Sequence, residues 1–106
     1  MNETQLTSQI KNYLTSIGAY NEKIFGGGYQ ASGVPDLIVC YKGLFVAIEV
    51  KSPTGKGRAS DIQKLKIRKI RESGGIAFVT DNIQDVMHII NCIDHDLPII
   101  YRDDYL

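Results

Sequence analysis

The stretch from Gly33 to Lys51, GVPDLIVCYKGLFVAIEVK, decides the fold. It contains two apolar runs, Leu37–Tyr41 and Leu44–Val50, separated only by the dipeptide Lys42-Gly43. Both runs are rich in Val, Ile, Leu and Phe and are short enough to be strands, so the pattern predicts a β-hairpin. Lys-Gly is a weaker turn sequence than Asn-Gly, and a bulge here would shift the pairing by one residue.

A two-residue turn would place Asp36 directly opposite Glu49 at the open end of the hairpin. Because strand side chains alternate, Asp36, Glu49 and Lys51 would project from the same face. Directly paired side chains have Cβ atoms about 4.5–5.5 Å apart, where like charges repel. A divalent cation turns this repulsion into attraction, since Mg²⁺ binds carboxylate oxygens. The hairpin therefore predicts half of a metal site, with a loop-ending Asp36 and a surface Glu49–Lys51 ion pair as the alternative.

The same residues carry a resemblance to a known family. Pro35-Asp36 followed by Glu49–Lys51 matches the PD-(D/E)XK nuclease pattern. Gly33 and Val34 before it, the loop Ser52–Gly55 after it, and Ser60 leading to Gln63 make the chain similar to the VRR-NUC family within that superfamily. The similarity covers roughly residues 3–90, which is most of the chain.

This resemblance implies a metal-dependent DNA nuclease, of a kind whose small stand-alone members occur in bacteriophages. Asp36, Glu49 and the backbone carbonyl of Val50 are then expected to hold one or two Mg²⁺ or Mn²⁺ ions. Lys51 would orient the attacking water or neutralise the phosphoryl oxygens. The expected substrate is branched DNA, resolved by a homodimer. A flap or replication-intermediate nuclease, a non-selective nuclease and a non-catalytic DNA-binding module are the alternatives.

Two further residues have both a structural and a functional interpretation. Glu3 begins a helix predicted over residues 3–17, where an acidic side chain complements the helix dipole. The resemblance implies instead that this glutamate lies near the metal. Gln63 is the last residue of the S-x-x-Q capping box that starts at Ser60. The resemblance implies that Gln63 also approaches the catalytic site, and both alternatives stay open for both residues.

The rest of the chain completes an α/β pattern in one domain, residues 1–106. Beyond the first helix and the hairpin, it predicts a strand over 19–25, a helix over 60–73, a central strand over 76–80 and a helix over 81–93. The order αβββαβα indicates a mixed β-sheet flanked by helices, as in a PD-(D/E)XK nuclease core. The apolar segment Ile99–Tyr101 is expected to form an edge strand or a subunit contact.

Composition narrows the class of protein. An apolar fraction of 43% indicates a globular chain. No apolar run approaches the roughly 20 residues that span a bilayer, and no signal-peptide pattern is present, so an intracellular protein without membrane contact is expected. Cys40 and Cys92 have no metal-ligand spacing, and Cys40, which alternates with core residues, is expected to be a buried free thiol.

Charge is unevenly distributed in a chain of zero net charge. Residues 51–71 contain eight basic side chains and one acid, a net charge of +7, whereas residues 72–106 carry −6 and residues 1–50 carry −1. A single basic stretch after a metal site predicts contacts with DNA phosphates, and a solvated helix face is the alternative. The predicted DNA-binding residues are Lys56, Arg58, Lys64, Arg68 and Arg71, with Tyr29 and Gln30 in the loop after the glycine run.

Overall fold

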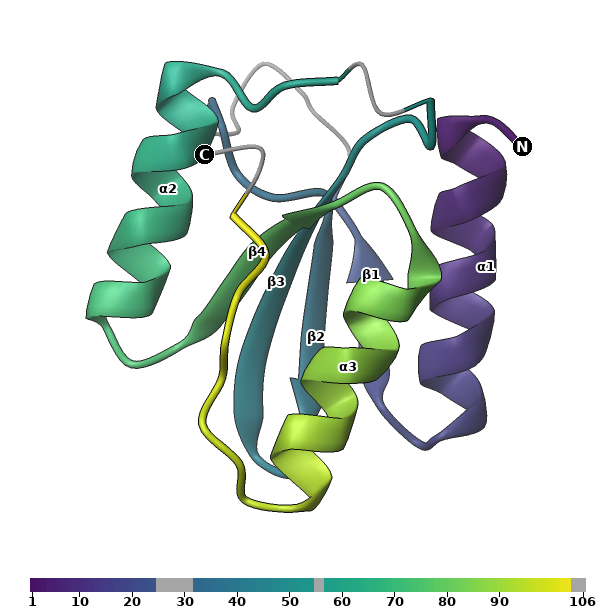
Figure 1. Ribbon diagram of the computed structural model, residues 1–106, viewed down its shortest axis with the longest axis vertical. Helices are drawn as coiled ribbons and strands as arrows, with labels where there is room; N and C mark the ends of the chain where they lie inside the picture. Colours follow the sequence, from purple (N-terminus) through teal and green to yellow (C-terminus); the bar gives the residue numbers. More distant parts are fainter. Residues whose placement is uncertain (25–31, 55–56, 104–106) are drawn as a thin grey trace.

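The computed structural model describes residues 1–24, 32–54 and 57–103 and contains three helices and four strands. Their order is the predicted αβββαβα (Figure 1). The elements are α1 (Glu3–Ser16), β1 (Tyr20–Lys23), β2 (Leu37–Tyr41), β3 (Leu44–Val50), α2 (Asp61–Glu72), β4 (Ile76–Thr80) and α3 (Ile83–Asp94).

The strands form one mixed sheet in the order β1-β2-β3-β4. β1 and β3 pair antiparallel with β2, while β3 and β4 are parallel and joined through α2. The mixed sheet is therefore confirmed, but the central position predicted for residues 76–80 is wrong, because β4 is the last strand of this sheet. All five residues of β4 are buried, because helices cover both faces of the sheet at this strand. A continuous apolar run therefore indicates that a strand is buried on both faces, and it does not indicate that the strand lies in the middle of the sheet.

The hairpin has the predicted register. Tyr41 pairs with Leu44 and Leu37 pairs with Ile48, so the ladder leads directly to Asp36 and Glu49. The turn residues Lys42 and Gly43 have φ values of 51° and 79°. Two consecutive positive φ values are those of a type I′ turn, whose twist matches that of paired strands. The less favoured Lys-Gly sequence adopts this turn without a bulge.

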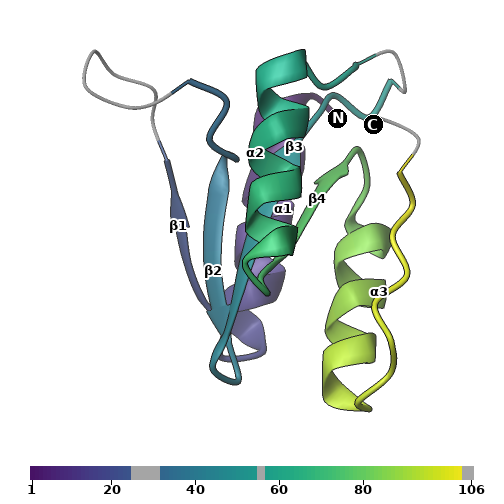
Figure 2. The same cartoon turned by 90° about the vertical axis from the view of Figure 1, so that its left-hand side faces the viewer.

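The two faces of the sheet are covered unequally. On one face, side chains of all three long strands pack against α1 and α3 in the main core, through Leu6, Ile10, Leu14, Val86, Ile89 and Ile90. Among the described residues, the other face is covered only by α2, whose Ile67 and Ile70 pack on Ala47, Ala77 and Val79. Figure 2 shows α2 in front of the β3 side of the sheet, with β1 and β2 beside it and no helix over them.

The expected burial of Cys40 is wrong, because this residue is exposed. Its neighbours Leu37 and Val39 point into the main core, while Cys40 points to the face that α2 covers only in part. Alternation along the strand was predicted correctly, but the sequence does not show how far a helix extends over a face. Cys92 on α3 is buried.

The segment after α3 runs beside β4 (Figure 1) and is largely used inside the chain. Ile99 and Tyr101 pack against the main core, while Ile100 is 72% exposed. Within the described part of the chain this segment does not form an edge strand. Two of its three apolar side chains pack inside the chain, so they do not offer a surface for a subunit contact. No helix among the described residues is long and apolar enough to cross a membrane.

Candidate active site

Asp36 and Glu49 meet where β2 begins and β3 ends. The Asp36 carboxylate accepts a hydrogen bond through Oδ2 from the backbone N–H of Val50, at 3.0 Å. Its own carbonyl accepts the N–H of Ile24 at 2.6 Å, so the residue is fixed from both neighbouring strands. Glu49 is only 4% exposed. The hairpin thus delivers one partly exposed and one buried carboxylate to the same place.

Burial and the charge of Asp36 raise the pKa of Glu49 to about 7, against the opposing effect of Lys51. A carboxylate that is buried beside a second carboxylate loses solvation and gains repulsion in its ionised form. Both costs fall when a cation binds, because the two negative charges then attract the same ion. The electrostatics of the pair therefore favour a positively charged ligand.

Lys51 and Gln63 complete the site from β3 and α2. The Lys51 ammonium lies 3.4 Å from Oε2 of Glu49 and donates to Oε1 of Gln63 at 3.0 Å. The same Gln63 oxygen accepts the backbone N–H of Ser60 at 2.9 Å, which closes the capping box of α2. The two interpretations of Gln63 are therefore compatible, because the same side-chain oxygen caps α2 and accepts the hydrogen bond from Lys51.

Gly33 explains how the loop before Asp36 approaches α2. Its φ of +81° is in the left-handed region, and a Cβ on this residue would lie 2.8 Å from the backbone carbon and oxygen of Ile62. Any larger side chain would push the loop away from the first turn of α2. Since Gln63 follows Ile62 directly, this close approach sets the position of the capping glutamine relative to the carboxylates.

Lys23 is a site neighbour that the sequence did not reveal. Its ammonium lies 3.8 Å from Oδ1 of Asp36. It also lines a polar groove of about 360 Å³ between α1 and β1, which Glu3 and Lys11 share. The pairing of β1 with β2 could have indicated Lys23, since it places Lys23 opposite Leu37, but a glycine-rich connection hides that register in the sequence.

The donor set fits a divalent cation in part. Asp36 and Glu49 supply the carboxylate oxygens that Mg²⁺ and Mn²⁺ prefer, and the Val50 backbone lies directly beside them. Over residues 1–24, 32–54 and 57–103, no three acidic, His or Cys side chains are grouped closely enough to share an ion. Glu3 therefore stands at the α1 groove and does not join the carboxylate pair in this arrangement.

The predicted DNA-binding residues have different surroundings. Tyr29, Gln30 and Lys56 lie outside the described residues. Arg58 and Arg68 are exposed, and Lys64 is half-buried on α2.

The side chain of Arg71 points from α2 towards β4 and the C-terminal segment. Its Nε donates to the carbonyl of Ala77 on β4 at 2.8 Å, and its guanidinium forms paired hydrogen bonds with Asp103. The guanidinium also lies 3.6 Å from the ring centre of Tyr101. Arg71 thus fastens the C-terminal segment to the free edge of the sheet, which separates it from the predicted basic stripe.

Comparison with known proteins agrees with this arrangement. The VRR-NUC domain model matches residues 4–82. The chain belongs to the VRR-NUC family. Two solved structures described as VRR_NUC domains resemble this one with TM-scores of 0.70 and 0.67, at 24% and 23% identity. The first match covers 84% of this chain and 94% of the other, and the second covers 86% of each.

The fold of this VRR-NUC domain extends to a further solved structure, the Hjc Holliday junction resolvase of Archaeoglobus fulgidus. The TM-score is 0.52 at 21% identity, over 72% of this chain and 64% of the other. Comparison with curated proteins found no match. The family and the α/β nuclease fold expected from the Gly33–Asp36 and Glu49–Lys51 motifs are therefore confirmed.

Proposed function

We propose that this VRR-NUC domain is a divalent-metal-dependent endodeoxyribonuclease that cuts branched DNA, four-way junctions included, and works as a homodimer. The observation that carries the proposal is the pair Asp36 and Glu49, with Lys51 in contact with Glu49 and fixed by Gln63. A protein that only binds DNA has no chemical reason to bury a carboxylate next to another carboxylate. The similarity in fold to a Holliday junction resolvase supports a branched substrate.

Asp36, Glu49 and the Val50 carbonyl would hold Mg²⁺ or Mn²⁺ in this proposal. Such an ion activates water and offsets negative charge on the scissile phosphate. Lys51 presents its ammonium to the phosphoryl oxygens or to the attacking water, at a position set by Gln63. Because that ammonium is held by Glu49 and the cap of α2, it needs little rearrangement when the substrate arrives.

The homodimer follows from the symmetry of the substrate. One chain carries one such site among its described residues and can cut one strand at a time. A four-way junction is roughly two-fold symmetric, and a two-fold dimer presents two sites to it. In mixed dimers in which one subunit carries Asp36→Asn, we expect a nick in one strand and no release of paired duplexes.

The decisive test compares a four-way junction, a flap, a splayed arm, a duplex and a single strand. Each is incubated with Mg²⁺, Mn²⁺ or EDTA. We expect symmetric cuts in the junction with either ion, none with EDTA, and a loss of orders of magnitude for Asp36→Asn. Glu72→Gln, an equally conservative change on the exposed end of α2, is the matched control. Cleavage by Asp36→Asn at the native rate would exclude the assigned site.

Contacts with the DNA backbone are assigned in this proposal to Lys64, Arg68 and Arg58. Replacing Lys64 and Arg68 by Ala should weaken binding to every DNA shape and lower the salt slope by roughly one unit for each lost contact. Arg71→Ala is the comparison, because Arg71 is engaged with Ala77 and Asp103. An unchanged salt slope in the double variant would show that this face of α2 meets only solvent.

A further inference from the structure

The half of the sheet that α2 leaves uncovered carries apolar side chains in a continuous row. Tyr20 pairs with Cys40, and Cys40 pairs with Phe45, so all three side chains project from the same face of three neighbouring strands. Tyr20 is 60% exposed, Phe45 is 46% exposed and Cys40 is exposed. A contiguous apolar surface of this kind marks an interaction site more often than isolated exposed residues do.

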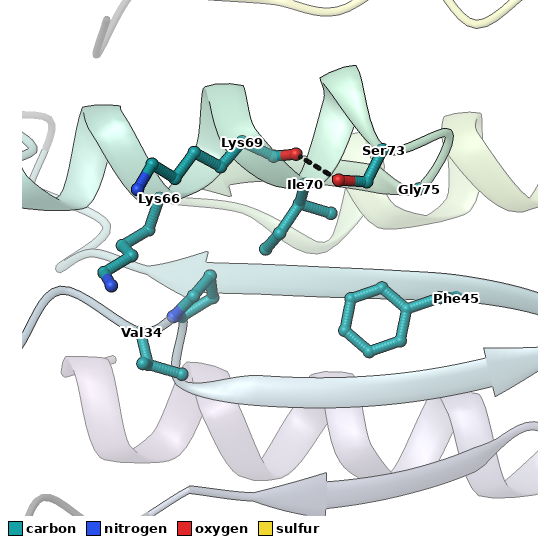
Figure 3. Close-up of a pocket in the computed structure, with 8 residues that line it drawn as sticks. Val34, Phe45, Lys66, Lys69, Ile70, Ser73 and Gly75 are labelled. Carbon is teal, nitrogen blue, oxygen red and sulfur yellow. Dashed lines mark hydrogen bonds between the residues drawn. The ribbon is translucent and has the colours of Figure 1, made fainter. Parts of the chain in front are cut away.

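A hollow continues this row towards α2. A cavity of about 430 Å³ lies between α2 and the hairpin, and Val34 and Pro35, which directly precede Asp36, line one end of it. Figure 3 shows Phe45 and Ile70 facing each other across it, with Val34 at one end. Lys66 and Lys69 from α2 also line it, so its floor is apolar and its helix side is basic.

The β1 side of the apolar row carries negative charge, whereas the α2 side carries positive charge. Glu22 on β1 pairs with Ile38, which pairs with Ala47, so Glu22 projects from the same face as the apolar row. It is exposed. The open surface therefore runs from an acid on β1, across apolar side chains on β2 and β3, to Lys66 and Lys69 on α2. We name this surface, from Glu22 to Lys69, the open face.

The pattern fits a second copy of the same chain. In a two-fold dimer each patch must be complementary to itself. When two open faces meet with the two-fold axis parallel to the strands, β1 of each copy lies against α2 of the other. Glu22 of each copy then contacts Lys66 and Lys69 of the other, so the interface contains this set of charge contacts twice. An axis across the strands would bring Glu22 against Glu22. Like charges placed together are unfavourable, so charge selects the first arrangement.

We infer that the chain dimerises through the open face, with the two-fold axis parallel to the strands and α2 of each copy over the uncovered strands of the other. This axis preserves the level of each row along the strands. Tyr20 is level with Phe45, so Tyr20 of the second copy reaches the cavity that Phe45 lines. A tyrosine suits this place, because its ring meets apolar walls while its hydroxyl lies near the lysines.

The arrangement has a consequence for the proposed nuclease, and this step rests on the proposed function. Asp36 and Glu49 lie one row beyond Ile38 and Ala47 on the same face of the sheet. With the axis parallel to the strands, both sites stand at the same end of the dimer. A branched substrate placed against that end would meet two sites at once.

The test uses charge reversal and sedimentation velocity. Glu22→Lys alone and Lys66→Glu/Lys69→Glu together should each weaken the dimer at least ten-fold, because each homodimer then carries two repelling contacts. An equimolar mixture of the two proteins should restore the dimer, since every contact in the mixed pair joins opposite charges. Met87→Lys is the matched control, because Met87 on α3 is as exposed as Phe45 and lies outside the open face.

Cross-linking of the native chain gives a second measurement that needs no variant. Cys40 lies near the axis and Cys92 is buried, so a short bismaleimide should join two copies, and Cys40→Ser should abolish the product. A native chain that sediments as a monomer with and without DNA would overturn the inference. So would a dimer that tolerates Glu22→Lys, or one that the mixture does not restore. None of these readouts depends on cleavage, so an inactive but dimeric chain would exclude the nuclease and leave the dimer standing.

Discussion

The two ends of the β2–β3 hairpin differ in whether their charged side chains are paired with opposite or with like charges. At the turn, Lys42 and Tyr41 both hydrogen-bond the exposed Asp94 carboxylate, at 2.6 and 2.7 Å, and hold its pKa below the ordinary value. At the open end, burial and the charge of Asp36 raise the pKa of Glu49 to about 7. The same two strands therefore end in a matched ion pair on one side and in opposed carboxylates on the other.

This difference separates what the fold needs from what the site needs. Opposite charges at the turn satisfy each other and leave no interaction for a ligand. Opposed carboxylates destabilise the metal-free protein; Lys51 offsets part of this cost at Glu49, and a bound cation or a proton relieves the rest. The free energy that the open end lacks must come from the main core around β2 and β3, where Leu37, Val39 and Ile48 are fully buried.

The largest difference between the two ends should appear in cleavage. Lys51→Ala removes the ammonium beside Glu49, and we expect the cleavage rate to fall about 100-fold or more, the usual effect of losing a group that stabilises charge in the transition state. Lys42→Ala removes an equivalent ammonium at the turn and should leave the rate unchanged. Single-turnover kinetics on a saturating DNA substrate measures both. Equal rates for the two variants would remove Lys51 from the mechanism.

The second difference concerns stability and its pH dependence. Glu49 keeps its proton in the folded chain up to about pH 7 but loses it in the unfolded chain near 4.5, so the folded state binds more protons between these values. The free energy of unfolding should therefore fall as pH rises from 4.5 to 7. Glu49→Gln should abolish this fall and gain on the order of 3 kcal/mol above pH 7.

Urea denaturation at several pH values in EDTA gives this free energy. Asp94→Asn is the control, and it should lower stability instead, because Asp94 is paired with Lys42 and Tyr41. Divalent ions should reduce the gain from Glu49→Gln, since the native pair then binds a cation. A Glu49→Gln protein with the same pH dependence as the native one would contradict the raised pKa.

The third difference uses two glycines with nearly the same backbone. Gly33 and Gly43 have φ values of +81° and +79°, but a Cβ on Gly43 meets nothing within 4 Å, while a Cβ on Gly33 meets the backbone of Ile62 at 2.8 Å. Gly43→Ala should cost about 1 kcal/mol for the left-handed conformation alone. Gly33→Ala adds the clash, so thermal denaturation should show a clearly larger loss, with reduced cleavage. Equal losses would mean that the loop moves away from α2 without cost.

The sequence predicted the geometry of the hairpin's open end better than the surroundings of that end. The apolar runs and the turn dipeptide determine the register, so Asp36, Glu49 and Lys51 were placed correctly from local pattern. Lys23 was missed because its proximity to Asp36 depends on the pairing of β1, which no local pattern encodes. The exposure of Cys40 and the inward direction of Arg71 depend on where α2 lies across the sheet, and the edge position of β4 depends on the pairing order of the strands. Helix placement and strand order both follow from contacts between residues far apart in the chain, so no local pattern shows them.

The smallest expected effect isolates the two roles of Gln63. Glu also suits the third position of a capping box, so Gln63→Glu should leave stability within about 0.5 kcal/mol of the native value. The new carboxylate, however, competes with Glu49 for the Lys51 ammonium, and cleavage should fall by a factor of ten or less. Gln63→Ala removes both contacts and should lose about 1 kcal/mol through the cap as well as activity. If Gln63→Glu cleaves at the native rate while Gln63→Ala loses only stability, the glutamine is a cap alone, and the open end of the hairpin positions Lys51 without help from α2.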